Sequence, residues 1–130
     1  MHSPTFLDVD DVLELHAGQI RRYGGSEGLR APGLLESAVA QASATYGGEY
    51  LNPDLFTMAA CYLFHLVKNH PFVDGNKRVG LESALVFLEL NGLSVEATDE
   101  ELVDLVLRAI SGEEDKERIA EFFRSHLASQ

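Results

Sequence analysis

Residues 55–69 read LFTMAACYLFHLVKN, and this stretch decides the fold. No charged side chain occurs over residues 55–67, and apolar side chains fall on nearly every side of a helical projection. Such a helix is buried on most sides instead of lying on a surface. It is also shorter than the roughly 20 apolar residues that a bilayer requires. We therefore predict that residues 55–69 form the central helix of the domain.

The residues before it predict two further helices. Apolar spacing over residues 10–22 is helical, and the glycine pair at residues 24–25 ends that pattern. Pro32 suits a first helical turn and opens a second predicted helix over residues 32–46. The apolar repeat of this second helix consists of Leu35, Val39, Ala42 and Tyr46.

Three helices are predicted after the central one. Pro71 disfavours helical geometry at the residue before it, so the central helix must end there. Helical spacing resumes over residues 76–90. Thr98 and Glu101 have the spacing of a capping box for a helix that ends near Ile110. One face of a last helix carries Ile119, Phe122, Phe123 and Leu127.

Composition agrees with an all-α domain. Leu and Ala together number 32 against 13 for Val and Ile, so helix-forming residues outweigh the residues that favour strands. The 130 residues are about the length of one domain. We predict a compact all-α domain over residues 1–130 with about six helices, and at most a short strand near residues 5–7.

Charge and cysteine content exclude several classes of protein. The 21 acidic and 10 basic residues give a net charge of −11, which repels phosphate backbones and disfavours direct nucleic-acid binding. The single cysteine, Cys61, excludes an intramolecular disulfide framework. The N-terminal sequence MHSPTFLDVDD lacks the features of a secretory signal, so we expect a cytoplasmic protein without membrane association.

Residues 70–78, HPFVDGNKR, concentrate the groups that phosphate chemistry needs. Backbone N–H groups at the start of the following helix can receive phosphate oxygens, and Gly75 permits close approach. Asn76 can add a side-chain donor. Lys77 and Arg78 lie about 100° apart around the helix and can bind different oxygens.

His70 and Asp74 supply the rest of this chemistry. A carboxylate beside bound phosphates is the natural ligand of Mg²⁺, which makes Asp74 the metal candidate. Histidine can take the proton of an attacking hydroxyl near working pH, which makes His70 the candidate base. His16 and His65 lie on apolar faces and are interpreted as core or positioning histidines, and Cys61 as a small buried hydrophobe.

The motif HPFVDGNKR resembles the signature loop of Fic/Doc proteins, specifically of the Doc, or death-on-curing, branch. The segments LHAGQIRRYGG and ALVFLELNG also resemble Doc proteins, so the resemblance covers essentially the whole chain. It implies a compact helical Fic/Doc fold and an ATP-dependent transfer onto a hydroxyl of a target protein. It further implies control by an antitoxin whose disordered C-terminal segment folds as it docks.

The resemblance also assigns roles by motif position. These are the base His70, the metal ligand Asp74, the nucleotide and phosphate binders Gly75, Asn76, Lys77 and Arg78, and the apolar loop anchor Phe72. ATP and Mg²⁺ are the cofactors it implies. Residues 46–50 correspond either to a flap that positions the target peptide, as in related folds, or to an ordinary turn between helices.

Two positions distinguish this motif from that of AMP-transferring relatives, which usually read HPFxDGNGRxxR. Lys77 stands where those proteins have a small glycine, and Leu81 stands where they have a second arginine. The Doc-like branch shares the lysine and is understood to phosphorylate elongation factor Tu on a threonine. The resemblance therefore favours a toxin that transfers phosphate to a Thr or Ser hydroxyl of elongation factor Tu and so inhibits translation.

Two other functions stay open at this point. One is AMP transfer to a protein hydroxyl, and the other is a catalytically silent module that only binds an antitoxin. A pure binding module needs neither a base nor a metal ligand, which argues against the second. Self-inhibited relatives carry a helix with the pattern Ser/Thr-x-x-x-Glu-Gly/Asn. Its nearest counterpart here, Thr45 to Glu49, is interrupted by glycines, so inhibition must come from a partner.

Overall fold

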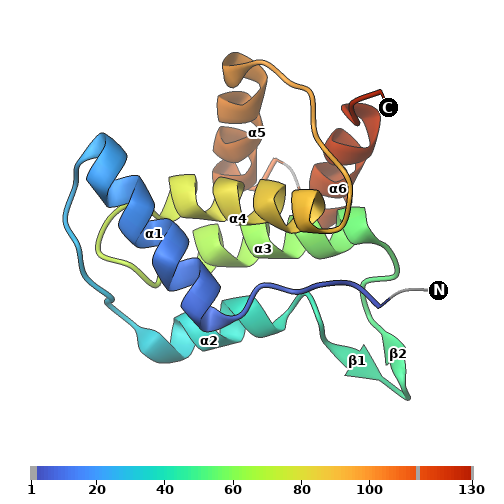
Figure 1. Ribbon diagram of the computed structural model, residues 1–130, viewed down its shortest axis with the longest axis horizontal. Helices are drawn as coiled ribbons and strands as arrows, with labels where there is room; N and C mark the ends of the chain where they lie inside the picture. The colour runs from blue at the N-terminus through green and yellow to red at the C-terminus, as the bar shows by residue number, and fades with distance from the viewer. Residues whose placement is uncertain (1–2, 114, 130) are drawn as a thin grey trace.

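A computed structural model of the protein describes residues 3–113 and 115–129. Six α-helices and one β-hairpin make up this part of the chain (Figure 1). In chain order they are α1 (Val9–Tyr23), α2 (Pro32–Ala40), β1 (Thr45–Tyr46), β2 (Glu49–Tyr50), α3 (Leu55–Asn69), α4 (Asn76–Leu90), α5 (Asp99–Ser111) and α6 (Lys116–Ser125). The predicted all-α class with about six helices is confirmed.

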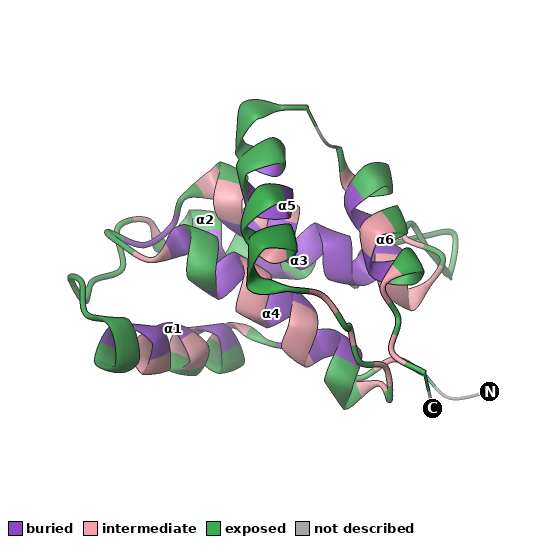
Figure 2. Ribbon diagram, turned by 90° about the horizontal axis from the view of Figure 1, so that it is seen from above, coloured by how far each residue is buried: buried purple, intermediate pink, exposed green. Residues whose placement is uncertain are grey.

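Helix α3 lies at the centre of the fold, where α2, α4, α5 and α6 all contact it. Eight of its fifteen residues are buried. Figure 2 shows the buried surface concentrated on α3 and on the facing side of α4, whereas most of α5 is exposed. The prediction of a buried central helix over residues 55–69 is confirmed with the same bounds.

Side-chain caps fix where most helices begin. Asp8, Asp54 and Thr98 each accept a hydrogen bond from the backbone N–H three residues on, and the side chain there accepts from the cap in return. The capping box predicted at Thr98 is therefore confirmed. Helix α4 differs, because its N-cap is Gly75 and no side chain caps it. Its first-turn N–H groups have no partner within the helix.

The predicted helix over residues 32–46 is too long, because α2 ends at Ala40 and the chain then forms the hairpin β1–β2. Gly47 and Gly48 have φ values of 60° and 83°, the left-handed geometry of a tight two-residue hairpin turn. The earlier members of the apolar repeat are buried, but Tyr46 is 83% exposed. The glycine pair thus reverses an extended chain instead of ending a helix.

Residues 5–7 form no strand in the described structure. Thr5 instead exchanges two hydrogen bonds with the side chain of Asn91, at 2.8 and 3.0 Å. The hydroxyl of Tyr62 accepts from the Leu7 N–H at 2.9 Å and donates to the Leu7 carbonyl at 3.2 Å. Burial raises the pKa of Tyr62 to about 12, so the hydroxyl keeps its proton for that bond. Side chains of α3 and at the end of α4 therefore hold the N-terminal segment.

The loop of residues 70–75 joins α3 to α4 at one edge of the molecule, and α1 ends at the same edge (Figure 1). Two ends of helices from distant parts of the sequence thus flank the start of α4. Within the described residues, no helix has the length and apolar character needed to cross a membrane.

Candidate active site

A pocket of about 290 Å³ lies at the edge where α3 and α4 are joined. It is lined by His70, Asp74, Gly75, Asn76 and Lys77, together with Val67, Val73 and Ile110. The structure thus brings five of the seven predicted site residues to one cavity. Of the other two, Arg78 lines an adjoining groove with Lys77, and Phe72 is buried beneath the loop.

The start of α4 supplies an anion site to this pocket. Gly75, the N-cap, has a left-handed backbone with φ 80°. Since no side chain caps the helix, the N–H groups of its first turn are free to receive an anion. The dipole of a helix favours negative charge at this end. The position predicted for phosphate binding therefore has the required backbone geometry.

His70 terminates α3 in a left-handed conformation, with φ 51° and ψ 53°. It is the one residue other than glycine with a positive φ in the described part of the chain. Such a backbone costs about 1–3 kcal/mol and persists only where neighbouring structure enforces it, typically at functional sites. The turn leaves His70 exposed and lining the pocket, where its ring can meet a hydroxyl.

Arg30 holds the backbone of His70. Its Nε donates to the His70 carbonyl at 2.9 Å and its Nη2 donates to the same oxygen at 2.5 Å. Nη2 also donates to the carbonyl of Asn69 at 3.1 Å. The motif at residues 70–78 did not point to Arg30. The sequence signal that could have indicated this contact is the cluster of glycines at residues 24, 25 and 28, which is typical of a loop that approaches another backbone closely.

Asp74 is held from two sides. Its Oδ1 accepts from the N–H of Gly75 at 2.9 Å, and its Oδ2 accepts from the N–H of Ser26 at 3.3 Å. His16 on α1 donates from Nε2 to the Asp74 carbonyl at 2.7 Å. The His16 ring also stacks on Phe72, with centroids 3.8 Å apart and planes 7° apart. His16 therefore supports the loop from the core side, as a positioning histidine.

The side chain of Asn76, expected from the sequence as a donor to phosphate, binds the backbone of Phe72 in the structure. Its Oδ1 accepts from the Phe72 N–H and its Nδ2 donates to the Phe72 carbonyl, both at 2.9 Å. Asn76 is only 4% exposed. Its side chain therefore fixes the loop, and only its backbone N–H belongs to the helix start. Phe72 itself is 1% exposed and packs into the core as the loop anchor.

Cations concentrate at this edge although the net charge of the chain is −11. The Arg78 guanidinium lies 4.7 Å from the ring centroid of Tyr23, and Arg22 pairs with Glu82 at 3.1 Å. A positive region within an acidic protein is what a polyanion site requires. Six of the ten Lys and Arg residues lie on the segments that meet here, namely Arg21, Arg22, Arg30, Lys68, Lys77 and Arg78.

The surroundings of Asp74 fit a magnesium ion that is bound together with phosphate. Among the described residues, no cluster of three or more His, Cys, Asp or Glu side chains could hold a metal by itself. Mg²⁺ does not need one, because it commonly takes one or two carboxylates plus waters and substrate oxygens. Each Asp74 oxygen accepts one N–H, and an ionised carboxylate has about four lone-pair sites. The exposed carboxylate therefore keeps room for an ion.

The hairpin that the resemblance suggested as a flap lies far from this pocket. It precedes the first residue of α3, whereas the loop of residues 70–75 follows the last, and a helix of 15 residues is about 22 Å long. Figure 1 shows the hairpin and the loop at opposite sides of the molecule. This placement favours the alternative of an ordinary turn between helices over that of a flap.

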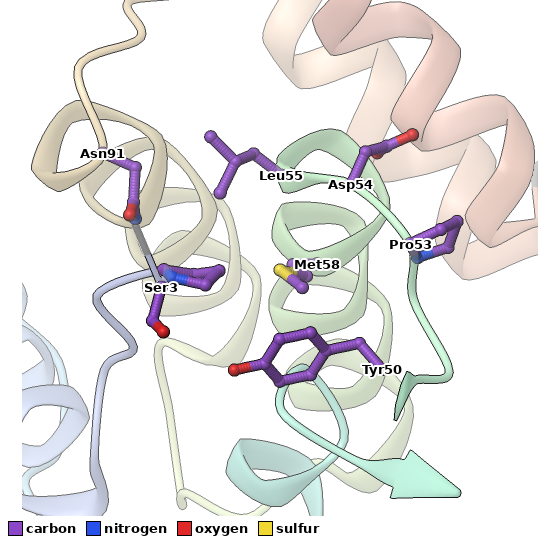
Figure 3. A pocket seen from close by; sticks show the side chains of 8 residues that line it. Ser3, Tyr50, Pro53, Asp54, Leu55, Met58 and Asn91 are labelled. Carbon is purple, nitrogen blue, oxygen red and sulfur yellow. The ribbon is translucent and has the colours of Figure 1, made fainter. Parts of the chain in front are cut away.

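A second cavity, of about 400 Å³, lies beside the hairpin (Figure 3). Tyr50, Leu55 and Met58 give it an apolar wall. Its carboxylate and its amide already have partners, because Asp54 caps α3 and pairs with Arg124, and Asn91 binds the N-terminal segment. No histidine or cation is among the residues that line it, so it lacks the groups for phosphate chemistry.

His65 and Cys61, which both lie on α3, are poor candidates for catalysis. Burial lowers the pKa of His65 to about 4, and the Lys116 ammonium adds to this shift. The neutral ring accepts a hydrogen bond from Lys116 Nζ at 3.1 Å. Burial raises the pKa of the Cys61 thiol, which keeps it protonated and unreactive. Both are structural side chains, as predicted.

Comparison with known proteins places this site in a family. The profile described as "Fic/DOC family" matches residues 6–88, a range that contains the pocket loop and Arg30. "Protein kinase doc" of Escherichia phage P1 is 37% identical over 118 residues, which are 91% of this chain and 92% of that relative. The chain belongs to the Fic/Doc family. A second Fic/Doc relative, "Toxin Doc" of Mycolicibacterium smegmatis, is 44% identical over 92 residues, 71% of this chain and 68% of the relative.

Both relatives of this Fic/Doc protein carry the name Doc. The resemblance to the Doc branch is therefore confirmed, and with it the helical Fic/Doc fold. The departures from the AMP-transferring pattern, Lys77 and Leu81, both fall within the matched range.

Proposed function

We propose that this Fic/Doc protein is a toxin that transfers the γ-phosphate of ATP to a Thr or Ser hydroxyl of elongation factor Tu and thereby inhibits translation. The observation that carries the proposal is the single pocket lined by His70, Asp74 and the uncapped start of α4. One relative is named a toxin, which supports the toxic action, and the other is named a protein kinase, which supports the phosphate transfer.

The phosphates of ATP bind at the start of α4. Backbone N–H groups of the first turn donate to phosphate oxygens, while Lys77 and Arg78 neutralise charge from different sides. Mg²⁺ held by Asp74 and the phosphates would supply further neutralisation of that charge. This arrangement lowers the barrier by positioning and electrostatics, which carry most of the catalysis in phosphoryl transfer.

His70 takes the proton from the attacking hydroxyl, a step that contributes about 10²–10⁴-fold to rate in general-base catalysis. The hydroxyl oxygen forms a bond to the γ-phosphorus while the bond from that phosphorus to the bridging oxygen breaks, and ADP leaves. The exposed position of His70 at the pocket lets a side chain of another protein reach it.

Leu81 supports phosphate transfer over AMP transfer. In AMP-transferring relatives an arginine stands at this position. Here Leu81 lines a groove together with two cations, Lys77 and Arg78, and with the apolar residues Val103, Val106 and Leu107. Without the arginine at position 81, the site lacks one of the phosphate contacts of AMP-transferring relatives and is less suited to hold ATP in the orientation that presents the α-phosphate.

Control by an antitoxin belongs to the same proposal, as does a cytoplasmic location, where ATP and the translation machinery are found. Thr45 and Glu49, the nearest match to a self-inhibitory helix, lie on the two strands of the hairpin. This placement supports inhibition from a separate protein, whose C-terminal segment folds as it docks.

Expression without an antitoxin tests the proposal. The intact chain should arrest bacterial growth and stop incorporation of labelled amino acids into protein, and His70→Ala should abolish both effects while keeping the helical circular-dichroism spectrum. His126→Gln is the matched control, because His126 lies beyond α6 and does not line the pocket. It should remain toxic. A folded His70→Ala protein that still arrests growth would contradict the assigned role of His70.

A further inference from the structure

We propose that Arg30 is the positioning residue for His70, holding the main chain of His70 in the left-handed conformation that presents its ring to the pocket. The functional consequence rests on the proposed role of His70 as the base. We call the hydrogen bonds from the Arg30 side chain to the main chain at His70 the clamp, and its existence does not depend on that role.

Local preferences oppose the conformation that His70 adopts. A residue other than glycine rarely has a φ near the observed 51°, because its Cβ crowds the following carbonyl oxygen. His70 also precedes Pro71, and residues before proline favour extended backbone. An unrestrained chain would therefore leave α3 in an extended direction at this residue, and a contact elsewhere must offset that tendency.

The guanidinium of Arg30 provides that contact. Its three hydrogen bonds go to the carbonyl oxygens of Asn69 and His70, which are among those left without partners at the end of a helix. A cation at this end also complements the helix dipole of α3. The planar fork of arginine can reach two carbonyls at once, which the single ammonium of lysine cannot do as rigidly.

The segment that carries Arg30 is itself fixed to the loop. The N–H groups of Arg30 and Ala31 donate to the Pro71 carbonyl at 2.8 and 2.9 Å, and the Val73 N–H donates to the Gly28 carbonyl at 3.0 Å. Between these bonds, Leu29 and Phe72 pair as an isolated antiparallel β-bridge. Arg30 is thus anchored through its main chain on one side of His70 and through its side chain on the other.

Arg30 is not among the residues that line the pocket, so it acts through His70 and not on the substrate. The phosphates are assigned to the start of α4, which Arg30 does not contact through any of these bonds. Loss of the clamp should therefore affect proton removal more than ATP binding. This separates Arg30 from Lys77 and Arg78, whose loss should weaken ATP binding.

Kinetics of purified variants provide the first test. Arg30→Ala should lower kcat by about 10²-fold, the scale expected for a misplaced catalytic group, with the KM for ATP unchanged. Arg30→Lys should recover only part of kcat, and guanidinium ion added to Arg30→Ala should restore part of it. Arg124→Ala is the control, because Arg124 also makes two close contacts, to Glu121 and Asp54, but near the first residues of α3. It should keep the wild-type kcat.

Nuclear magnetic resonance tests the clamp without any reaction. A positive φ brings the amide and α protons of one residue close together, so wild-type His70 should show a strong intraresidue Overhauser effect that weakens in Arg30→Ala. Arg30→Lys gives the same comparison if Arg30→Ala does not fold. A full-strength effect at His70 in a folded Arg30 variant overturns the clamp, and so does an unchanged kcat. If the wild type transfers no phosphate, the proposed function fails while this measurement still decides the role of Arg30.

Discussion

At the scale of single residues, the position of Asp74 depends on the absence of a side chain at Gly25. Gly25 has φ 118°, and a Cβ there would lie 2.7 Å from Asp74 Oδ2 and 3.2 Å from Ile20 Cδ1. We expect Gly25→Ala to push the carboxylate away from the start of α4. The measurement is the Mg²⁺ concentration that gives half-maximal phosphate transfer, which should rise.

Gly24→Ala is the control for this prediction. Gly24 also has a left-handed φ, of 80°, but a Cβ there would meet no atom within 4 Å. Gly24 has ψ −179°, a backbone region essentially restricted to glycine, so this variant should lose about 1–3 kcal/mol of unfolding free energy in urea titrations while its Mg²⁺ requirement stays unchanged. If Gly25→Ala and Gly24→Ala have the same Mg²⁺ requirement, Asp74 does not hold the ion as proposed.

Asn76 and Lys77 are neighbours in sequence with different tasks. Asn76→Ala leaves the buried N–H and carbonyl of Phe72 without partners, which should lower the free energy of unfolding by about 1–3 kcal/mol in urea titrations. Lys77→Ala removes an exposed side chain, so it should leave stability unchanged and weaken ATP binding in calorimetric titrations. An Asn76→Ala protein as stable as wild type would contradict the assignment of its side chain to the loop.

At the scale of secondary-structure elements, His126 joins the end of α6 to the start of α5. Its Nδ1 lies 2.8 Å from the Phe122 carbonyl and its Nε2 lies 2.8 Å from the Glu101 carboxylate. Both partners accept hydrogen bonds, so the two contacts together require a protonated ring. The bond to Phe122, followed by that to Glu101, raises the pKa of His126.

This contact predicts a pH dependence of stability. A histidine with a raised pKa in the folded state stabilises fully below its unfolded pKa of about 6.5, and this contribution is lost as pH rises through the folded value. The contribution of His65 to stability changes with pH in the opposite direction, because its lowered pKa makes folding less favourable as pH falls below about 6.5. The two effects overlap in one pH range.

The comparison of wild type with His126→Gln separates the two histidines, since His65 is present in both proteins. In urea unfolding, the wild type should be the more stable of the two at about pH 5.5, and this advantage should shrink toward about pH 8.5. An advantage that is constant with pH would show that His126 contributes only packing.

The helices could be predicted from the sequence because their determinants are local. Residues 55–69 and 76–90 have the same bounds in the structure, since apolar spacing and the proline at position 71 specify them. The end of α2 could not be predicted in this way, because Tyr46 continues the helical repeat even though it lies on a strand. A glycine pair can end a helix or turn a hairpin, and pairing with β2 decides between the two.

The chemistry of the candidate site could be predicted from nine consecutive residues, but the contacts that orient it could not. Arg30 reaches His70 across 40 positions, and such contacts leave no periodic pattern. The motif predicted an amide side chain at Asn76 but not its orientation. In the folded protein this buried side chain binds the backbone of Phe72. Residue type was thus predictable, whereas side-chain orientation required the packed fold.

At the scale of the whole molecule, the fold brings most of its cations to one edge. Six of the ten cations lie on segments that meet beside the pocket loop, although acidic residues outnumber basic ones by 21 to 10 in the chain. This distribution lets an acidic protein offer a positive site to a nucleotide while its general surface repels other polyanions. The extent of the domain over residues 1–130 and the identity of the target protein stay predictions, because neither follows from the local geometry of the pocket.

The most direct test of the central claim follows the phosphates of ATP. The purified protein is incubated with Mg²⁺, elongation factor Tu and ATP that carries a label on either its α- or its γ-phosphate, with His70→Ala as the inactive control. We expect the γ label to appear on elongation factor Tu and the α label on released ADP, and His70→Ala to transfer neither. Appearance of the α label on elongation factor Tu, or of no label from either position, would contradict the central claim.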